Sequence, residues 1–112
     1  MTSIKIVKSK SYGYLSFEVK GHSGYANSGA DIVCAAVSSV TELAINILES
    51  FSVDFKLDIR EDSAYVLLEI VQNESNFSKR EIIENIVGGY AGYLKQLSGE
   101  YPTNIKCILT EK

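Results

Sequence analysis

The sequence has little of the positive charge on which nucleic-acid-binding proteins depend. Its 112 residues include 11 lysines and arginines against 14 aspartates and glutamates, and the basic residues form no cluster. Because a nucleic-acid-binding protein has to neutralise phosphates, this balance disfavours a nucleic-acid partner. The N-terminus alternates apolar and charged residues, so it lacks the continuous apolar core of a signal peptide. No uninterrupted apolar run approaches the ~20 residues of a membrane span, so we expect a cytoplasmic protein without a membrane partner.

Cysteine and histidine are also scarce, because the chain has two cysteines, Cys34 and Cys107, and one histidine, His22. In the cytosol thiols are kept reduced, so both cysteines are expected to be free thiols. Cys107 alternates with two apolar residues and is expected to be an inert part of the core. The length fits a single domain over residues 1–112, and a domain this small would gain stability from dimerisation.

The periodicity of apolar residues predicts an α+β fold. Alternating patterns predict five strands, and helical spacing predicts a helix over 31–51 and a second one that begins with a capping box at Ser78 and Glu81. The strands are expected at residues 4–8, 14–20, 53–60, 64–71 and 104–110. The order β-β-α-β-β-α-β indicates a two-layer α/β sandwich, with two helices on one face of a five-stranded, mainly antiparallel sheet. The order of the strands in the sheet stays open.

The stretch from 21 to 38 contains the residues that can carry chemistry. Residues 21–29 hold three glycines and no periodicity, which is typical of a loop. With a helix that begins near Asp31, Cys34 falls in the first turn, where unpaired N–H groups and the helix dipole favour a thiolate. Those N–H groups, including that of Cys34, are also candidates to hold an oxyanion. His22 in the loop is the candidate general base and acid for a Cys34 nucleophile.

Each of the other residues of this stretch has two possible roles, one functional and one structural. Asp31 either orients His22 or caps the helix, and Ser38, one turn beyond Cys34, either contacts substrate or is an exposed helix serine. Gly21 and Gly24 either let the loop accept a peptide or only make turns. Cys34 itself has a plainer reading as a small buried hydrophobe. A metal site is disfavoured, because zinc takes three or four ligands and only His22, Cys34 and Asp31 are near one another in sequence; no cofactor is expected.

Two motifs in this stretch resemble the signature of a known family. Residues 21–26 read G-H-S-G-Y-A and residues 29–38 read G-A-D-I-V-C-A-A-V-S, with twelve positions from His22 to Cys34. Together they resemble the bacterial ribosomal-processing cysteine protease family, Prp. In that family the first motif supplies a histidine and the second supplies a cysteine, so the resemblance implies catalytic roles for His22 and Cys34.

The resemblance also implies a substrate and an assembly. Prp-like enzymes remove the aromatic-rich N-terminal extension of a bacterial large-subunit ribosomal protein, the one near the peptidyl-transferase centre, during ribosome maturation. Members have an α/β sandwich fold and are homodimers. The alternative interpretation is a ribosome-associated binding module that grips a peptide in the same groove without cleaving it.

Overall fold

The structure is a computed structural model that describes residues 1–21 and 28–112, with the side chains of residues 28–31 left aside. It contains the five expected strands and two long helices, and the fold class is confirmed. The strands are β1 (Thr2–Ser9), β2 (Gly13–Lys20), β3 (Phe55–Arg60), β4 (Tyr65–Ile70) and β5 (Ile105–Glu111). The helices are α1 (Ser28–Ser50), α2 (Glu74–Phe77) and α3 (Arg80–Glu100).

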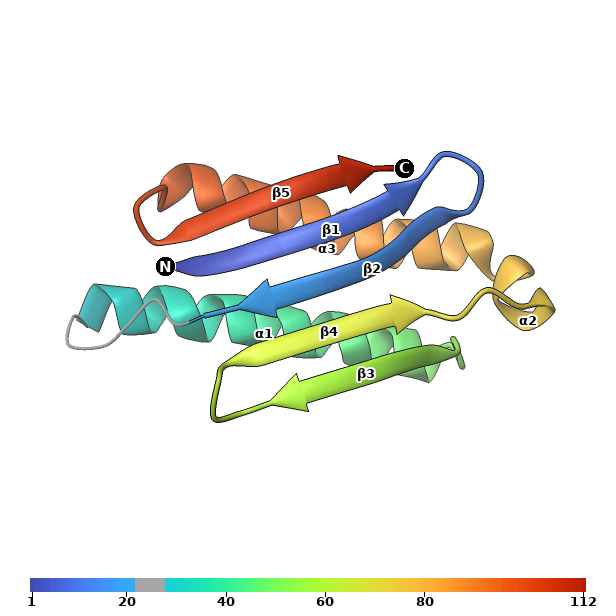
Figure 1. Ribbon diagram of the computed structural model, residues 1–112, viewed down its shortest axis with the longest axis horizontal. Helices are drawn as coiled ribbons and strands as arrows, with labels where there is room; N and C mark the ends of the chain where they lie inside the picture. The colour runs from blue at the N-terminus through green and yellow to red at the C-terminus, as the bar shows by residue number, and fades with distance from the viewer. Residues whose placement is uncertain (22–27) are drawn as a thin grey trace.

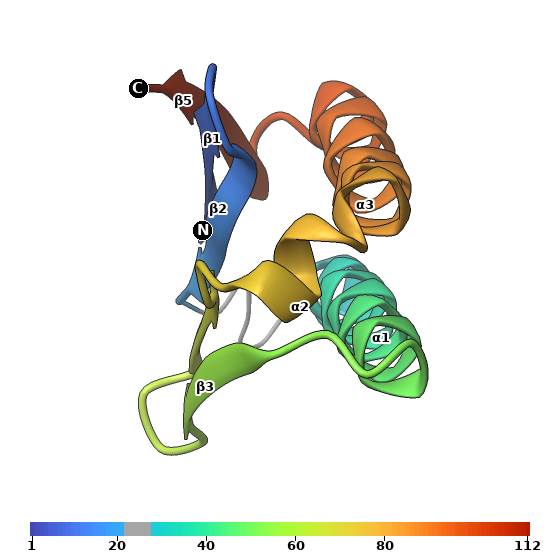
Figure 2. The same cartoon turned by 90° about the vertical axis from the view of Figure 1, so that its right-hand side faces the viewer.

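The strands form one sheet in the order β3-β4-β2-β1-β5 (Figure 1). Only the β1–β5 pair is parallel, and the other three pairs are antiparallel, as expected for a mainly antiparallel sheet. Both long helices lie on the same face of the sheet (Figure 2). The parallel pair follows from the long return through α3, because a parallel neighbour cannot be reached by a tight hairpin.

The core lies between the sheet and the two long helices. Along β1, Thr2, Ile4 and Ile6 are buried and the residues between them are exposed, which is the period of two expected for a strand with one covered face. From β2, Phe17 packs on Tyr90 of α3 with ring centroids 4.5 Å apart. The apolar core residues of the helices are Val33, Val37, Ala44, Ile45 and Leu48 in α1 and Ile83, Val87, Tyr90, Leu94 and Leu97 in α3.

The apolar composition of α1 is explained by this packing. By length and composition alone, Ile32–Ser50 is apolar enough to cross a membrane, with a mean hydropathy of 1.6. The same stretch supplies the core residues Val37, Ala44 and Leu48, which pack within the two-layer fold. An apolar core helix passes the same test as a membrane span, so the composition of α1 is weak evidence for one.

Two expected helix starts differ from the structure. The first helix begins at Ser28, three residues earlier than expected, which moves Cys34 from the first turn to the second. The prediction of a capping box at Ser78 and Glu81 is wrong. The helix α3 begins after Lys79, whose side chain makes no capping hydrogen bond, and the Ser78 hydroxyl donates to Ser75 O instead. The polar link before it forms α2, since the Asn73 side chain caps that turn by accepting from the Asn76 N–H at 2.9 Å.

The edge strand β3 is less covered than its alternation predicts. Val53, just before it, is buried and Phe55 is half-buried, as expected. Alternation along residues 53–60 predicts that Leu57 and Ile59 point inward with Val53 and Phe55, yet they are 40% and 53% exposed. They lie on the strand at the sheet edge, beyond the part of the sheet that the helices cover. An apolar strip therefore stays open beside β4.

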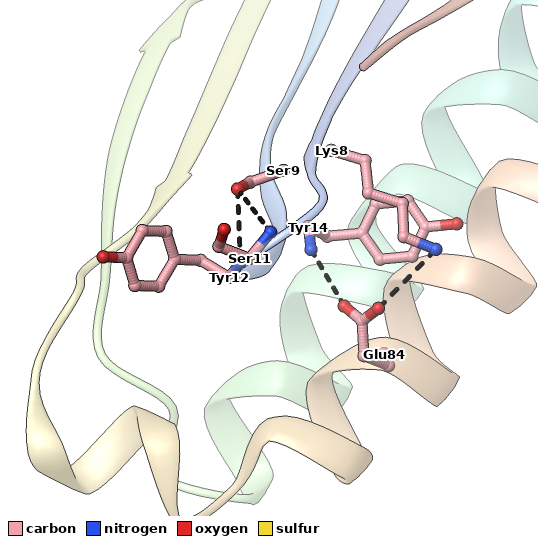
Figure 3. A network of polar contacts seen from close by, with 6 residues as sticks. All are labelled: Lys8, Ser9, Ser11, Tyr12, Tyr14 and Glu84. Atoms are coloured by element: carbon pink, nitrogen blue, oxygen red, sulfur yellow. Dashed lines mark hydrogen bonds and ion pairs between the residues drawn. The ribbon is translucent and has the colours of Figure 1, made fainter. Parts of the chain in front are cut away.

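The β1–β2 hairpin is fixed to α3 at the end of the sheet away from the start of β1. Glu84 accepts a hydrogen bond from the Tyr14 N–H at 2.8 Å and lies 3.7 Å from the Lys8 ammonium (Figure 3). Gly13 has a φ of 77°, and a Cβ there would meet the Glu84 carboxylate. The hairpin therefore requires glycine at this position.

Candidate active site

Cys34 lies at the border of the core, as its position on the helix predicts. It is half-buried, whereas its neighbour Val33 is buried and Ile32 is exposed. Val37, one turn further on, is also buried. The sulfur is therefore on a free thiol that is neither sealed among apolar side chains nor fully in solvent.

Cys34 lines a cavity of about 230 Å³. The cavity is bounded by the start of β1, the end of β2, residues 34–45 of α1 and the turn between β3 and β4 with the strand ends beside it. The Gly21 N–H donates to Ala64 O at 3.1 Å and so joins two of these walls. The lining residues are Thr2, Val19, Gly21, Cys34, Val37, Ser38, Thr41, Glu42, Ile45, Ile59, Arg60, Glu61, Ala64, Tyr65 and Val66.

The structure brings together three of the residues singled out in the sequence. Cys34, Ser38 and Gly21 all line the cavity. His22 and Gly24 lie outside the described residues, and so does the side chain of Asp31, whose backbone belongs to the first turns of α1. The roles of these residues therefore stay predictions.

The earlier start of α1 changes one expectation about Cys34. Only the first four N–H groups of a helix lack a partner within it, and here these belong to residues 28–31. Cys34 is the seventh residue of α1, so its own N–H falls within the regular helical hydrogen bonding. The expectation that the Cys34 N–H holds an oxyanion is wrong for this reason. The influence of the helix dipole also falls off within the first turn, so a proton-accepting partner becomes the more important requirement.

A pair of hydroxyls joins Thr41, which lines the cavity from α1, to Tyr90 of α3. The Thr41 hydroxyl donates to Val37 O at 2.8 Å and lies 2.9 Å from the Tyr90 hydroxyl. Because the single hydrogen of Thr41 is used on Val37, Tyr90 must be the donor to Thr41. Burial holds the pKa of Tyr90 above its ordinary value, so Tyr90 keeps the proton that it donates.

Charged residues from the β3–β4 turn and α1 stand at the cavity rim. The Arg60 guanidinium bonds the Asp58 carboxylate at 3.1 Å and lies 5.4 Å from the centre of the Tyr65 ring. Glu42 and Glu61 make no ion pair with any residue that the structure describes. Sequence periodicity does not single out Arg60 and Glu61, since they come near Cys34 only through the pairing of β4 with β2.

Cys107 lies in a different environment from Cys34. It is half-buried on β5, packs against the core and lines a hollow with Gly88 and Lys95 of α3. Burial raises the pKa of the Cys107 thiol, and Lys95 opposes this in part. The expected role as an inert core residue agrees with this placement.

No metal site emerges from residues 1–21 and 32–112. Among them, no three histidine, cysteine, aspartate or glutamate side chains lie close enough together to hold an ion.

The chain is similar to known proteins over almost its whole length. Residues 1–106 match the family model described as cysteine protease Prp. The ribosomal processing cysteine protease Prp of Bacillus subtilis is 31% identical over 109 residues, which cover 95% of each chain.

Solved structures share the fold. A Prp protease from S. aureus, solved in complex with a substrate peptide, superposes with a TM-score of 0.83 at 20% identity, over 98% of this chain and all of that one. A second S. aureus structure, with a covalently linked product peptide, has a TM-score of 0.78 at 21% identity and covers all of both chains. With the fold, the half-exposed cysteine at a cavity and the match of residues 1–106 in agreement, this chain belongs to the Prp family of cysteine proteases.

Proposed function

We propose that this protein, as one domain of residues 1–112, removes the aromatic-rich N-terminal extension from the precursor of a bacterial large-subunit ribosomal protein, the one near the peptidyl-transferase centre. The observation that carries the proposal is the half-buried thiol of Cys34 on the wall of a cavity with room for a substrate side chain. The similarity to the ribosomal processing protease of Bacillus subtilis supports the choice of substrate. Such cleavage would be a step in ribosome maturation.

The proposed mechanism uses a Cys34–His22 dyad. His22 takes the proton from the Cys34 thiol, and the sulfur attacks the carbonyl carbon of the scissile peptide bond. When the tetrahedral intermediate collapses, His22 gives that proton to the leaving amine, and the acyl group stays on the sulfur as a thioester. Water, deprotonated by His22, then hydrolyses the thioester and restores the thiol. Asp31 is proposed to orient His22, as the third member of a triad does.

The walls of the cavity suit an aromatic substrate. Val19, Val37 and Ile45 provide apolar surface beside Cys34, and Ile59 extends it along the open strip of β3. Ser38 and Gly21 lie on the same cavity and are proposed to contact the bound peptide, with Gly24 as a further contact from the loop. Burial of an aromatic side chain here would supply binding energy close to the reacting thiol.

The decisive experiment compares cleavage by Cys34→Ala with cleavage by the unchanged protein. The purified protein is incubated with the ribosomal-protein precursor, and the products are identified by mass spectrometry. We expect loss of the N-terminal extension with the unchanged protein and at least a thousandfold slower cleavage with Cys34→Ala. Cys107→Ala is the matched control and should cleave at the original rate. Equal cleavage by Cys34→Ala would show that another group is the nucleophile.

The setting of this reaction is also proposed. We expect a cytoplasmic homodimer that binds neither nucleic acid nor membrane. Support for the dimer comes from an apolar groove on the outer side of α1 and α3, where Leu43 is 58% exposed. A second copy of the chain would bury this surface. The groove is lined by Val40, Leu43, Ala44, Ile47, Gly89, Tyr90 and Tyr93.

A further inference from the structure

We propose that Tyr90 is a positioning residue for the reaction at Cys34, because its hydrogen bond with Thr41 holds α1, and with it the Cys34 thiol, at one fixed position against the sheet. The inference rests on the proposed function, since it takes Cys34 as the nucleophile. It goes further by giving a role in turnover to a residue of α3 that lies outside both sequence motifs.

The bond between Thr41 and Tyr90 is the directional link between α1 and the rest of the fold. For residues 32–50 of α1, no other side chain forms a hydrogen bond with another helix or strand that the structure describes. The remaining contacts of α1 with the core are apolar, through residues such as Val37 and Leu48. Apolar packing has no preferred direction, whereas a hydrogen bond weakens steeply when its distance or angle changes. The hydroxyl pair therefore fixes the rotation and the axial position of α1.

Both hydroxyls of the pair are held in place. The Tyr90 side chain is 4% exposed, and its ring lies 4.5 Å from that of Phe17 on β2, the middle strand of the sheet. The Thr41 side chain is 3% exposed, and its own hydrogen bond to Val37 O at 2.8 Å selects its rotamer. Tyr90 therefore places Thr41 relative to the sheet.

A regular helix carries this placement from Thr41 to Cys34. The two residues are seven positions apart in α1, which is close to two turns and ~10 Å along the axis, so they lie on the same side of the helix. Both line the cavity, with Ser38 between them. Because a helix moves as a stiff unit, a small slide or rotation of α1 at Thr41 displaces the thiol as well. A misplacement of ~1 Å at a reacting group can slow turnover by ~100-fold.

The stability of the fold does not require the hydroxyl pair. When both partners of a buried hydrogen bond are replaced by apolar groups of the same shape, stability is often unchanged or higher. Removal of one partner has a different effect, because Thr41→Val leaves the Tyr90 hydroxyl without an acceptor. A variant with both Thr41→Val and Tyr90→Phe removes both hydroxyls and leaves neither unsatisfied. This double variant therefore separates the position of α1 from the stability of the protein.

The test compares the unchanged protein, Tyr90→Phe, Thr41→Val and the double variant. The melting temperature of each protein is measured, together with kcat and KM for cleavage of the ribosomal-protein precursor. We expect the melting temperature to be lowest in Thr41→Val and to return to its original value in the double variant. We expect kcat to fall about five- to tenfold in Tyr90→Phe and to stay low in the double variant, because both lack the bond that places Cys34. The KM of Tyr90→Phe should stay within about twofold of the original, because Tyr90 does not line the cavity.

The matched control is Tyr93→Phe, which removes the hydroxyl of a tyrosine of α3 that is 45% exposed and should keep the original kcat. Return of kcat to its original value in the double variant would overturn the positioning role, since turnover would then follow stability alone. An unchanged kcat in Tyr90→Phe, or an equal fall in Tyr93→Phe, would overturn it too. Failure of the proposed function has a different signature, since then the unchanged protein does not cleave the precursor or Cys34→Ala cleaves it as well.

Discussion

At the scale of single residues, the two cysteines show how placement decides reactivity. Both are free thiols and both are half-buried, yet only Cys34 lines the cavity at the end of β2. Cys107 packs against core residues between β5 and α3. The sequence also distinguishes them, because one lies in a helix after a glycine-rich loop and the other lies in an alternating strand.

Alkylation should separate the two thiols. Because the thiolate is the reactive form and burial raises the pKa of Cys107, less of that thiol is ionised at any pH below its pKa. In the folded protein at pH 8, we expect iodoacetamide to modify Cys107 at least tenfold more slowly than Cys34, as followed by mass spectrometry of the two peptides. The rate at Cys107 should keep rising at pH values where an unperturbed thiol has levelled off. The prediction would be contradicted if both cysteines of the folded protein were alkylated at equal rates and the rate at Cys107 levelled off at the ordinary pKa of a thiol.

Gly21 should be intolerant of any side chain. Its φ is 90°, and a Cβ at this position would lie 2.7 Å from the backbone oxygen of Met1. We expect Gly21→Ala to lower the free energy of unfolding by at least about 1 kcal/mol in urea titrations and to reduce cleavage, because Gly21 also lines the cavity.

The matched control for this change is Gly92→Ala in α3. A Cβ at Gly92 meets nothing within 4 Å, so alanine there should leave stability unchanged or raise it by up to about 1 kcal/mol. The sequence left two interpretations of Gly21, which either lets the loop accept a peptide or only makes a turn. The positive φ of Gly21 adds a structural requirement for glycine at this position. A Gly21→Ala protein as stable as the unchanged one would argue against that requirement.

At the scale of elements, the short helix α2 is fixed by one buried side chain. The Asn76 amide is 3% exposed and makes three hydrogen bonds of 2.7–2.9 Å. Its oxygen accepts from the Asp54 N–H, and its nitrogen donates to Asp54 O and Val71 O. These bonds join the chain before β3 to the chain after β4, so α2 closes that end of the hairpin. Sequence periodicity cannot reveal such a contact, because α2 is a single turn with no repeat to detect.

Removal of this amide should be costly. We expect Asn76→Ala to lower the free energy of unfolding by about 2–4 kcal/mol, because three hydrogen bonds are lost and the Asp54 N–H and Val71 O lose the side chain that pairs with them. Asn46→Ala is the control, because Asn46 is exposed on α1, and it should change stability by less than about 0.5 kcal/mol. Urea unfolding of both variants measures the difference. Similar stabilities would mean that α2 is not held by Asn76.

At the scale of the whole molecule, the two helices leave an apolar groove on their outer side. If a second copy binds there, a charge in the groove should weaken the dimer. We expect Leu43→Glu to shift the protein from dimer to monomer by light scattering, while Phe51→Glu, a change of an equally apolar residue outside the groove, leaves the dimer intact. If light scattering gives the same molar mass for the unchanged protein, Leu43→Glu and Phe51→Glu, the groove is not a dimer interface.

The sequence by itself determined the five strands, the two long helices, the fold class and the placement of Cys34 near the start of the first long helix. These depend on local periodicity and on the motifs around Cys34, which are properties of consecutive residues. It also gave the family, through the motifs that contain His22 and Cys34, and the match over residues 1–106 confirms it.

Only the tertiary structure decided what surrounds Cys34. The order β3-β4-β2-β1-β5 brings Thr2, the β3–β4 turn and α1 to one end of the sheet, although they are up to about sixty residues apart in sequence. Periodicity shows which face of a strand is covered, but it carries no information on which strands are neighbours. The cavity and its charged rim both follow from that choice of neighbours.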